Sequence, residues 1–79
     1  MAIQNALRFI NEIRDNDEFR NVLNNLKPTE IDLFLNQIGL PFTYDEFEDS
    51  TRYLLLRCQF EHEAMEVQEI AYWYKILVA

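Results

Sequence analysis

The sequence predicts an all-α fold, a small bundle of three short helices packed on one long C-terminal helix. Apolar residues recur at three- and four-residue steps, which places them on one face of a helix. Residues that cap or end helices separate these stretches. The segment 44–78 contains neither glycine nor proline. Because 79 residues supply one core, we expect a single domain over residues 1–79.

The first two helices are expected before residue 28. Apolar spacing predicts a helix over about 3–14. Asp15, Asn16 and Asp17 follow, and a short side-chain oxygen among them can accept an amide and start a second helix. Asp15 and Glu18 also have the spacing of a capping box, with Asp in place of Ser or Thr. Pro28 disfavours helical backbone at the residue before it, so the second helix should end there.

The third and fourth helices are indicated by capping residues. Thr29 is the expected cap of the third helix, and Gly39 should end it, because a helix often finishes in a left-handed conformation that glycine adopts freely. Thr43 and Glu46 form a second capping box, which predicts that the fourth helix begins there. We expect this helix to cover 44–78.

The long helix carries apolar residues on two sides. One set repeats every seven residues, as in a coiled-coil seam: Tyr53, Phe60, Val67 and Tyr74. A second stripe lies on the opposite side: Leu54, Cys58, Met65, Tyr72 and Ile76. A continuous helix over 44–78 would be about 50 Å long, whereas a compact chain of this size is roughly 30 Å across. Part of the helix should therefore project, and a break in it would remove this argument.

A projecting apolar face predicts association with another protein. We expect a homodimer through the C-terminal helix, and a partner protein on the same face is the alternative. Trp, Tyr and Met are frequent at the centres of interfaces. The expected contact residues are therefore Leu54, Cys58, Met65, Tyr72, Trp73 and Ile76.

The composition argues against several other classes of function. The net charge of −7 argues against nucleic acid and against an anionic membrane surface. A single glycine excludes the glycine-rich loops that hold nucleotide cofactors, so no cofactor is expected. One cysteine excludes an internal disulfide, and no signal peptide or membrane span is visible, so we expect a cytoplasmic protein.

The candidates for catalysis or metal binding have simpler explanations. His62, Glu66 and Glu69 share a helix face that a metal ion could use, but an exposed charged face accounts for them equally well. The acidic residues 45–49 fit the start of a helix, where the dipole stabilises negative charge. Cys58 lies in an apolar stripe without a nearby base, as an interface thiol would. We therefore expect no catalytic residue, no metal site and no enzyme activity, with a small enzyme as an alternative.

Two segments resemble the Nif-eleven family, small domains associated with nitrogen-fixation loci and with leader peptides of ribosomally made natural products. The first match comprises Phe9, Ile10, Ile13, Asn16, Glu18, Phe19, Arg20 and Leu23. The second comprises Gly39, Phe42, Thr43, Asp45 and Glu46. The similarity covers about 3–56, and 57–79 would be a helical extension.

The resemblance implies a recognition or accessory role linked to nitrogen fixation or to peptide modification. Leader-peptide members usually end in a Gly-Gly type cleavage site followed by a core peptide. No glycine follows Gly39 here, which predicts a standalone domain. A leader-peptide-like substrate of a modifying enzyme is the alternative function.

Overall fold

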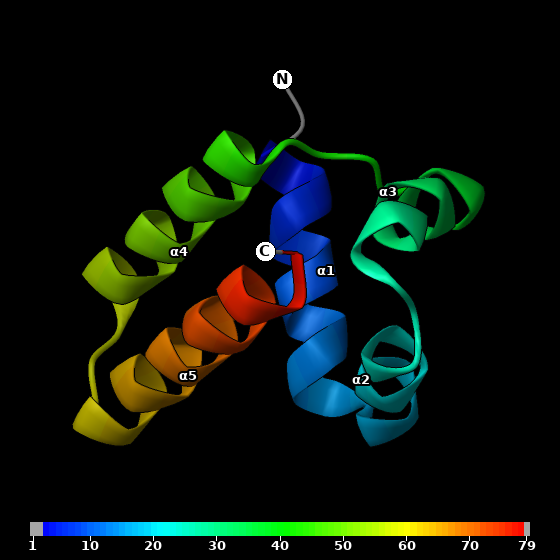
Figure 1. Ribbon diagram of the computed structural model, residues 1–79. Helices are drawn as coiled ribbons and strands as arrows, with labels where there is room; N and C mark the ends of the chain where they lie inside the picture. Colours follow the sequence, from blue (N-terminus) through cyan, green and yellow to red (C-terminus); the bar gives the residue numbers. More distant parts are fainter. Residues whose placement is uncertain (1–2, 79) are drawn as a thin grey trace.

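The computed structural model describes residues 3–78, which form five helices and no strands (Figure 1). The helices are α1 (Ile3–Asp15), α2 (Asp17–Asn24), α3 (Pro28–Gln37), α4 (Tyr44–Arg57) and α5 (Glu61–Val78). The all-α class predicted from the sequence is thus confirmed. Helix α1 lies in the middle, with α4 and α5 as an antiparallel pair on one side and with α2 and α3 on the other (Figure 1).

The prediction of one helix over 44–78 is wrong, because the chain turns between α4 and α5. Cys58 has an extended backbone, with ψ at 128°. The carbonyl of Phe60 accepts hydrogen bonds from the amides of Glu63 and Ala64 at 3.1 and 3.3 Å, which starts α5. Glu61 and Glu63 then place negative charge in its first turn, where the helix dipole favours it.

Burial is the physical reason for this turn. Folding α5 back along α4 buries Val67, Ile70 and Tyr74, which are at most 4% exposed. A continuous helix of about 50 Å would leave these side chains in water, whereas the folded chain extends over only 34 × 26 × 21 Å. The projecting helix is therefore absent, and the argument for association from helix length fails.

The seven-residue seam is divided by the same turn. Val67 and Tyr74 on α5 face the core, whereas Tyr53 and Phe60 are 44% and 59% exposed. The seam predicts one continuous buried line only if the helix stays straight. Because the chain reverses at residues 58–60, the two halves of the pattern face different surroundings.

Phe9 on α1 is the centre of the core. Its ring makes edge-to-face contacts with Phe42 and Tyr74, with centroids 5.1 and 5.3 Å apart, and more distant ones with Phe19 and Phe47. Such contacts add to the gain from burying the rings. The core thus joins residues from all five helices. Its buried members are Phe9, Ile10, Ile13, Leu23, Ile31, Leu35, Phe47, Ile70 and Tyr74.

Helix α2 starts one residue later than the capping box of Asp15 and Glu18 predicts. Its cap is Asn16, another of the three candidates at 15–17, and the Asn16 side chain accepts hydrogen bonds from the amides of Glu18 and Phe19 at 3.0 and 3.3 Å. Helix α1 includes Asp15, so Asn16 is the first residue after it with an extended backbone. The amide oxygen of Asn16 thus satisfies two amides that lack a partner within the helix.

Helix α3 begins one residue before its expected cap. Pro28 is its first residue and Lys27 is its cap, whereas Thr29 was the expected cap. Proline is favoured at the first helical position because its missing N–H would have no partner there. The Glu30 carboxylate accepts the Lys27 amide at 2.8 Å and completes the start of the helix.

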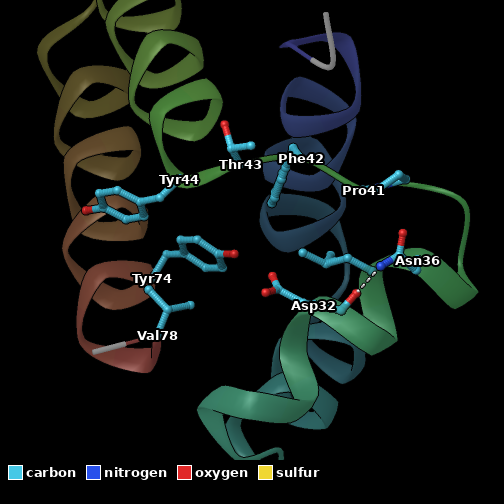
Figure 2. A pocket seen from close by; sticks show the side chains of 9 residues that line it. Asp32, Asn36, Pro41, Phe42, Thr43, Tyr44, Tyr74 and Val78 are labelled. Carbon is cyan, nitrogen blue, oxygen red and sulfur yellow. Dashed lines mark hydrogen bonds between the residues drawn. The ribbon is translucent and has the colours of Figure 1, made fainter.

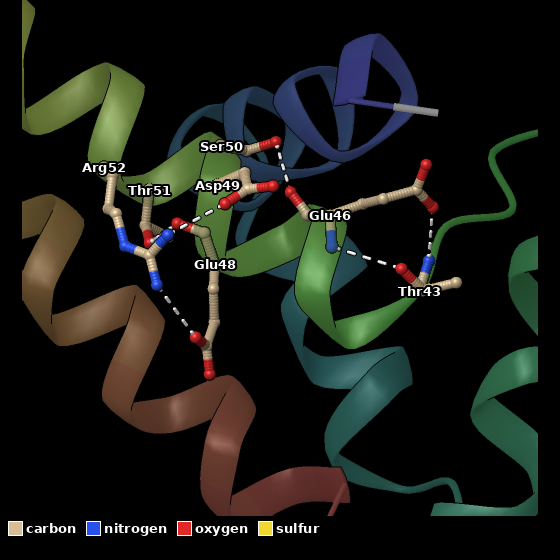
Figure 3. Close-up of polar contacts among 7 residues, drawn as sticks. All are labelled: Thr43, Glu46, Glu48, Asp49, Ser50, Thr51 and Arg52. Carbon is tan, nitrogen blue, oxygen red and sulfur yellow. Dashed lines mark hydrogen bonds and ion pairs between the residues drawn. The ribbon is translucent and has the colours of Figure 1, made fainter. Parts of the chain in front are cut away.

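The end of α3 and the start of α4 agree with the sequence prediction. Gly39 has φ at +77°, the left-handed conformation expected after the helix. Thr43 and Glu46 form the predicted capping box: the Thr43 hydroxyl accepts the Glu46 amide at 3.1 Å, and the Glu46 carboxylate accepts the Thr43 amide at 2.7 Å (Figure 3). Ser50, one turn later, is fully buried and donates to the Glu46 carbonyl at 2.8 Å.

Candidate functional site

Three of the expected contact residues form an exposed stripe on the outer face of α5. Met65, Tyr72 and Ile76 are 62%, 68% and 58% exposed. At about 100° per residue these positions lie within roughly 40° of one another around the helix. The stripe covers twelve residues, and its ends lie about 16 Å apart at the helical rise. We name Met65, Tyr72 and Ile76 the outer stripe.

Trp73 lies beside the outer stripe and is half-buried. Its indole N–H donates to the side-chain oxygen of Asn24 at 2.7 Å. The guanidinium carbon of Arg20 lies 4.9 Å from the centre of the indole ring, within the range of a cation–π contact. A shallow, largely apolar hollow of about 130 Å³ adjoins the stripe and is lined by Asn24, Trp73, Ile76 and Leu77. The expected contact residue Trp73 is thus held in a fixed orientation, and part of its side chain is exposed to solvent.

Leu54 and Cys58 lie apart from the outer stripe. Leu54 packs against the core cluster, and Cys58 is half-buried with its thiol near the Leu54 carbonyl, at 3.1 Å. Both line a small hollow that also contains Arg14, Arg57 and Val67. Because the chain turns at residues 58–60, the structure divides the second apolar stripe between the inner side of the α4–α5 pair and the outer face of α5.

A second group of exposed apolar side chains lies near the α4–α5 turn. Leu56 is 87% exposed and Phe60 is 59% exposed. Tyr53, one turn before Leu56, is partly covered by Arg57, whose guanidinium carbon lies 5.4 Å from the ring centre. The seven-residue repeat in the sequence assigned Tyr53 and Phe60 to the seam. The acidic pair Glu61 and Glu63 is the signal that a new helix starts there.

The polar side of α5 is attached to the N-terminal helices by two ion pairs. Arg14 contacts Glu66 at 3.0 Å, and Arg20 contacts Glu69 at 2.7 Å. All four side chains are partly exposed, so each pair adds little to stability. They lie beside the buried face of α5, which consists of Val67, Ile70 and Tyr74.

These ion pairs also engage two of the three residues considered for a metal. Glu66 and Glu69 bind arginines, while His62 stacks on Phe60 with ring centroids 5.7 Å apart. Within the described part of the chain, no three His, Cys, Asp or Glu side chains converge on a point where they could hold a metal ion.

The acidic residues at the start of α4 have structural partners. Glu46 caps the helix, and Arg52 contacts Glu48 at 3.3 Å and Asp49 at 2.9 Å (Figure 3). Arg52 is four residues after Glu48 and three after Asp49, the spacings at which helical side chains meet. The cluster therefore fits the role of a helix start, as its sequence suggests.

Comparison with the models of known protein families finds no match, and comparisons with curated proteins and with solved structures find none either. In residues 3–78 no helix combines the length and the apolar character that a membrane crossing requires.

Proposed function

We propose that this chain is a non-enzymatic protein-recognition domain that acts through the outer stripe of α5, and that the occupant of this face is a second copy of the chain. The observation that carries the proposal is the exposure of Met65, Tyr72 and Ile76 on one helix face, between 58% and 68%. Methionine and tyrosine are favoured where an interface excludes water. The half-buried Trp73 provides a rigid aromatic edge beside them.

The order of residues along the stripe favours self-association. When two copies of one helix pack antiparallel about a twofold axis, a residue that precedes the axis faces the residue that follows it by the same number of positions in the second copy. An axis between residues 70 and 71 places Met65 opposite Ile76 of the second copy.

The charge of the C-terminal half indicates what a different protein bound to the outer stripe would look like. Residues 44–79 contain three basic and eight acidic residues. A different partner on the same face would therefore be apolar at its centre and basic at its rim. The resemblance to the Nif-eleven family supports an accessory role in nitrogen fixation or peptide modification as part of the proposal. The single cysteine supports a cytoplasmic location.

The oligomeric state tests the proposal. Light scattering of the full chain over a hundredfold range of concentration should show a dimer that dissociates on dilution. The double variant Met65→Ser, Tyr72→Ser should shift the transition to higher concentration by at least about tenfold, because each substitution removes exposed apolar area from the contact.

Leu33→Ser is the matched control, because Leu33 is 60% exposed on α3 and is not part of the outer stripe. This variant should dimerise as the wild type does. A monomeric wild type at the highest concentration contradicts self-association, and an equal effect of the control contradicts the assignment of the outer stripe.

A further inference from the structure

A cleft of about 540 Å³ lies between α3, the segment that precedes α4, and the end of α5 (Figure 2). This cleft does not include the outer stripe. Its polar and aromatic walls come from helices that are distant in the sequence. The lining residues are Asp32, Leu35, Asn36, Pro41, Phe42, Thr43, Tyr44, Tyr74 and Val78.

Two polar groups face each other across the cleft. Tyr74 is only 4% exposed, yet its hydroxyl points out of the core toward Asp32 on the opposite wall (Figure 2). Neither the Tyr74 hydroxyl nor the Asp32 carboxylate forms a hydrogen bond or ion pair with another side chain within residues 3–78. Both groups are thus available to a ligand.

The cleft carries negative charge that no lining residue balances. Of the lining residues within 3–78, Asp32 is the charged one, and none is a lysine, arginine or histidine. Burial, followed by the negative charge of Asp32, raises the pKa of the Tyr74 hydroxyl well above its ordinary value. The hydroxyl is therefore neutral at physiological pH, and its oxygen can accept a hydrogen bond.

Aromatic rings form the remaining wall. Phe42 extends into the cleft, and its ring centre lies 5.8 Å from that of Tyr74 (Figure 2). Tyr44 stacks on the far side of Tyr74, with ring centres 6.3 Å apart and planes 9° from parallel. Aromatic faces attract cations through the ring quadrupole. Leu35 and Val78 add an apolar surface suited to an alkyl chain.

From this arrangement we infer that the cleft binds an alkylammonium group. The ammonium donates to the Asp32 carboxylate and to the Tyr74 hydroxyl oxygen, and it lies against the ring of Phe42. The alkyl chain packs on Leu35 and Val78. An anion is repelled by Asp32, and the net charge of −7 favours cations at the whole surface. The group that fits is the side chain of a lysine or a free primary amine.

Titration of the full chain with n-butylammonium chloride tests the site, with the ring signals of Tyr74 and Phe42 followed by NMR. We expect saturable shifts at both rings. An equal concentration of n-butanol, which has the same alkyl chain without charge, should bind several-fold more weakly. Equal binding of n-butanol overturns the inference, because it shows an apolar hollow that does not recognise charge.

Asp32→Asn should weaken n-butylammonium binding about two- to fivefold, the range expected for an ion pair open to water. Asp15→Asn is the matched control, since it removes one negative charge outside the cleft and should leave the binding unchanged. Circular dichroism verifies that both variants fold. Equal weakening in both variants overturns the inference, because it shows attraction by net charge alone.

A second titration, with N-acetyl-lysine methylamide, distinguishes the two sources of the group. Tighter binding than n-butylammonium supports a lysine side chain of a peptide whose backbone contacts the rim at Pro41 and Thr43. Equal or weaker binding supports a free amine in the same site. The light-scattering result for the outer stripe is independent of both titrations, since none of its residues lines the cleft.

Discussion

Trp73 donates its indole N–H to the side chain of Asn24 at 2.7 Å, across 49 positions of sequence. This bond joins α5 to the last turn of α2. Because Trp73 is next to Tyr72 of the outer stripe, the bond also fixes the orientation of the face that we propose as an interface. Removing this hydrogen bond should lower the stability of the protein.

Asn24→Ala should lower the free energy of unfolding by about 0.5–1.5 kcal/mol, because the half-buried indole N–H loses its acceptor. Urea unfolding followed by the fluorescence of Trp73 measures the change. Asn11→Ala is the control, since Asn11 is exposed on α1 and its side chain makes no hydrogen bond with residues 3–78. Equal stability of the two variants would show that the bond adds nothing.

Phe9→Ala should cost about 3–5 kcal/mol of stability, the usual range for deletion of a buried aromatic ring. Phe9 is fully buried, and its replacement removes the contacts with the rings of Phe42 and Tyr74. Chemical denaturation should show a large decrease or an unfolded chain. Leu33→Ala, at a position 60% exposed, should stay within about 0.5 kcal/mol of the wild type.

Gly39→Ala should be destabilising by about 1–2 kcal/mol, the cost of left-handed backbone for a residue with a Cβ. A Cβ built at this position meets nothing within 4 Å, so the cost is conformational and involves no collision. Differential scanning calorimetry should show a lower melting temperature, while Gln37→Ala, two residues earlier on an exposed position, leaves it nearly unchanged. Identical melting of the two variants refutes the explanation.

Stability should decrease as the pH rises above about 10, because burial raises the pKa of Tyr74 from its ordinary value of 10.0. In the unfolded chain the hydroxyl ionises near pH 10 and in the folded chain only at higher pH, so alkali favours unfolding. Urea midpoints at pH 8, 9, 10 and 11 measure the loss. Tyr74→Phe should show a shallower decline than Tyr72→Phe, which removes an exposed hydroxyl. Parallel curves for the two variants contradict the assignment.

Cross-linking tests the antiparallel pairing proposed for the dimer. In a Cys58→Ser background, chains with Met65→Cys and chains with Ile76→Cys should form mixed disulfide dimers faster than either forms dimers with itself. The reason is that an axis between residues 70 and 71 brings these two positions together. Faster self-cross-linking of either single variant rejects this register, even if the protein is a dimer.

The sequence is sufficient to predict those parts of the fold that local chemistry determines. Gly39 and the box of Thr43 and Glu46 have their predicted conformations because each depends on backbone within a few residues. The starts of α2 and α3 were displaced by one or two residues, since Asn16 and Pro28 also satisfy the local rules.

The turn at residues 58–60 is not predicted, because no glycine or proline marks it and the gain comes from burying Val67, Ile70 and Tyr74 elsewhere. The prediction of one continuous helix does not affect the outer stripe, since Met65, Tyr72 and Ile76 all lie on α5. The cleft could not be predicted: Asp32 and Tyr74 face each other only after α3 and α5 pack together.

The contact between Phe9 and Tyr74 spans 65 positions, nearly the whole chain. A ribosome releases the first of these residues long before the second, so this contact can form only after nearly the whole chain has been made. Because the core needs residues from both ends of the chain, we expect its final closure to be cooperative.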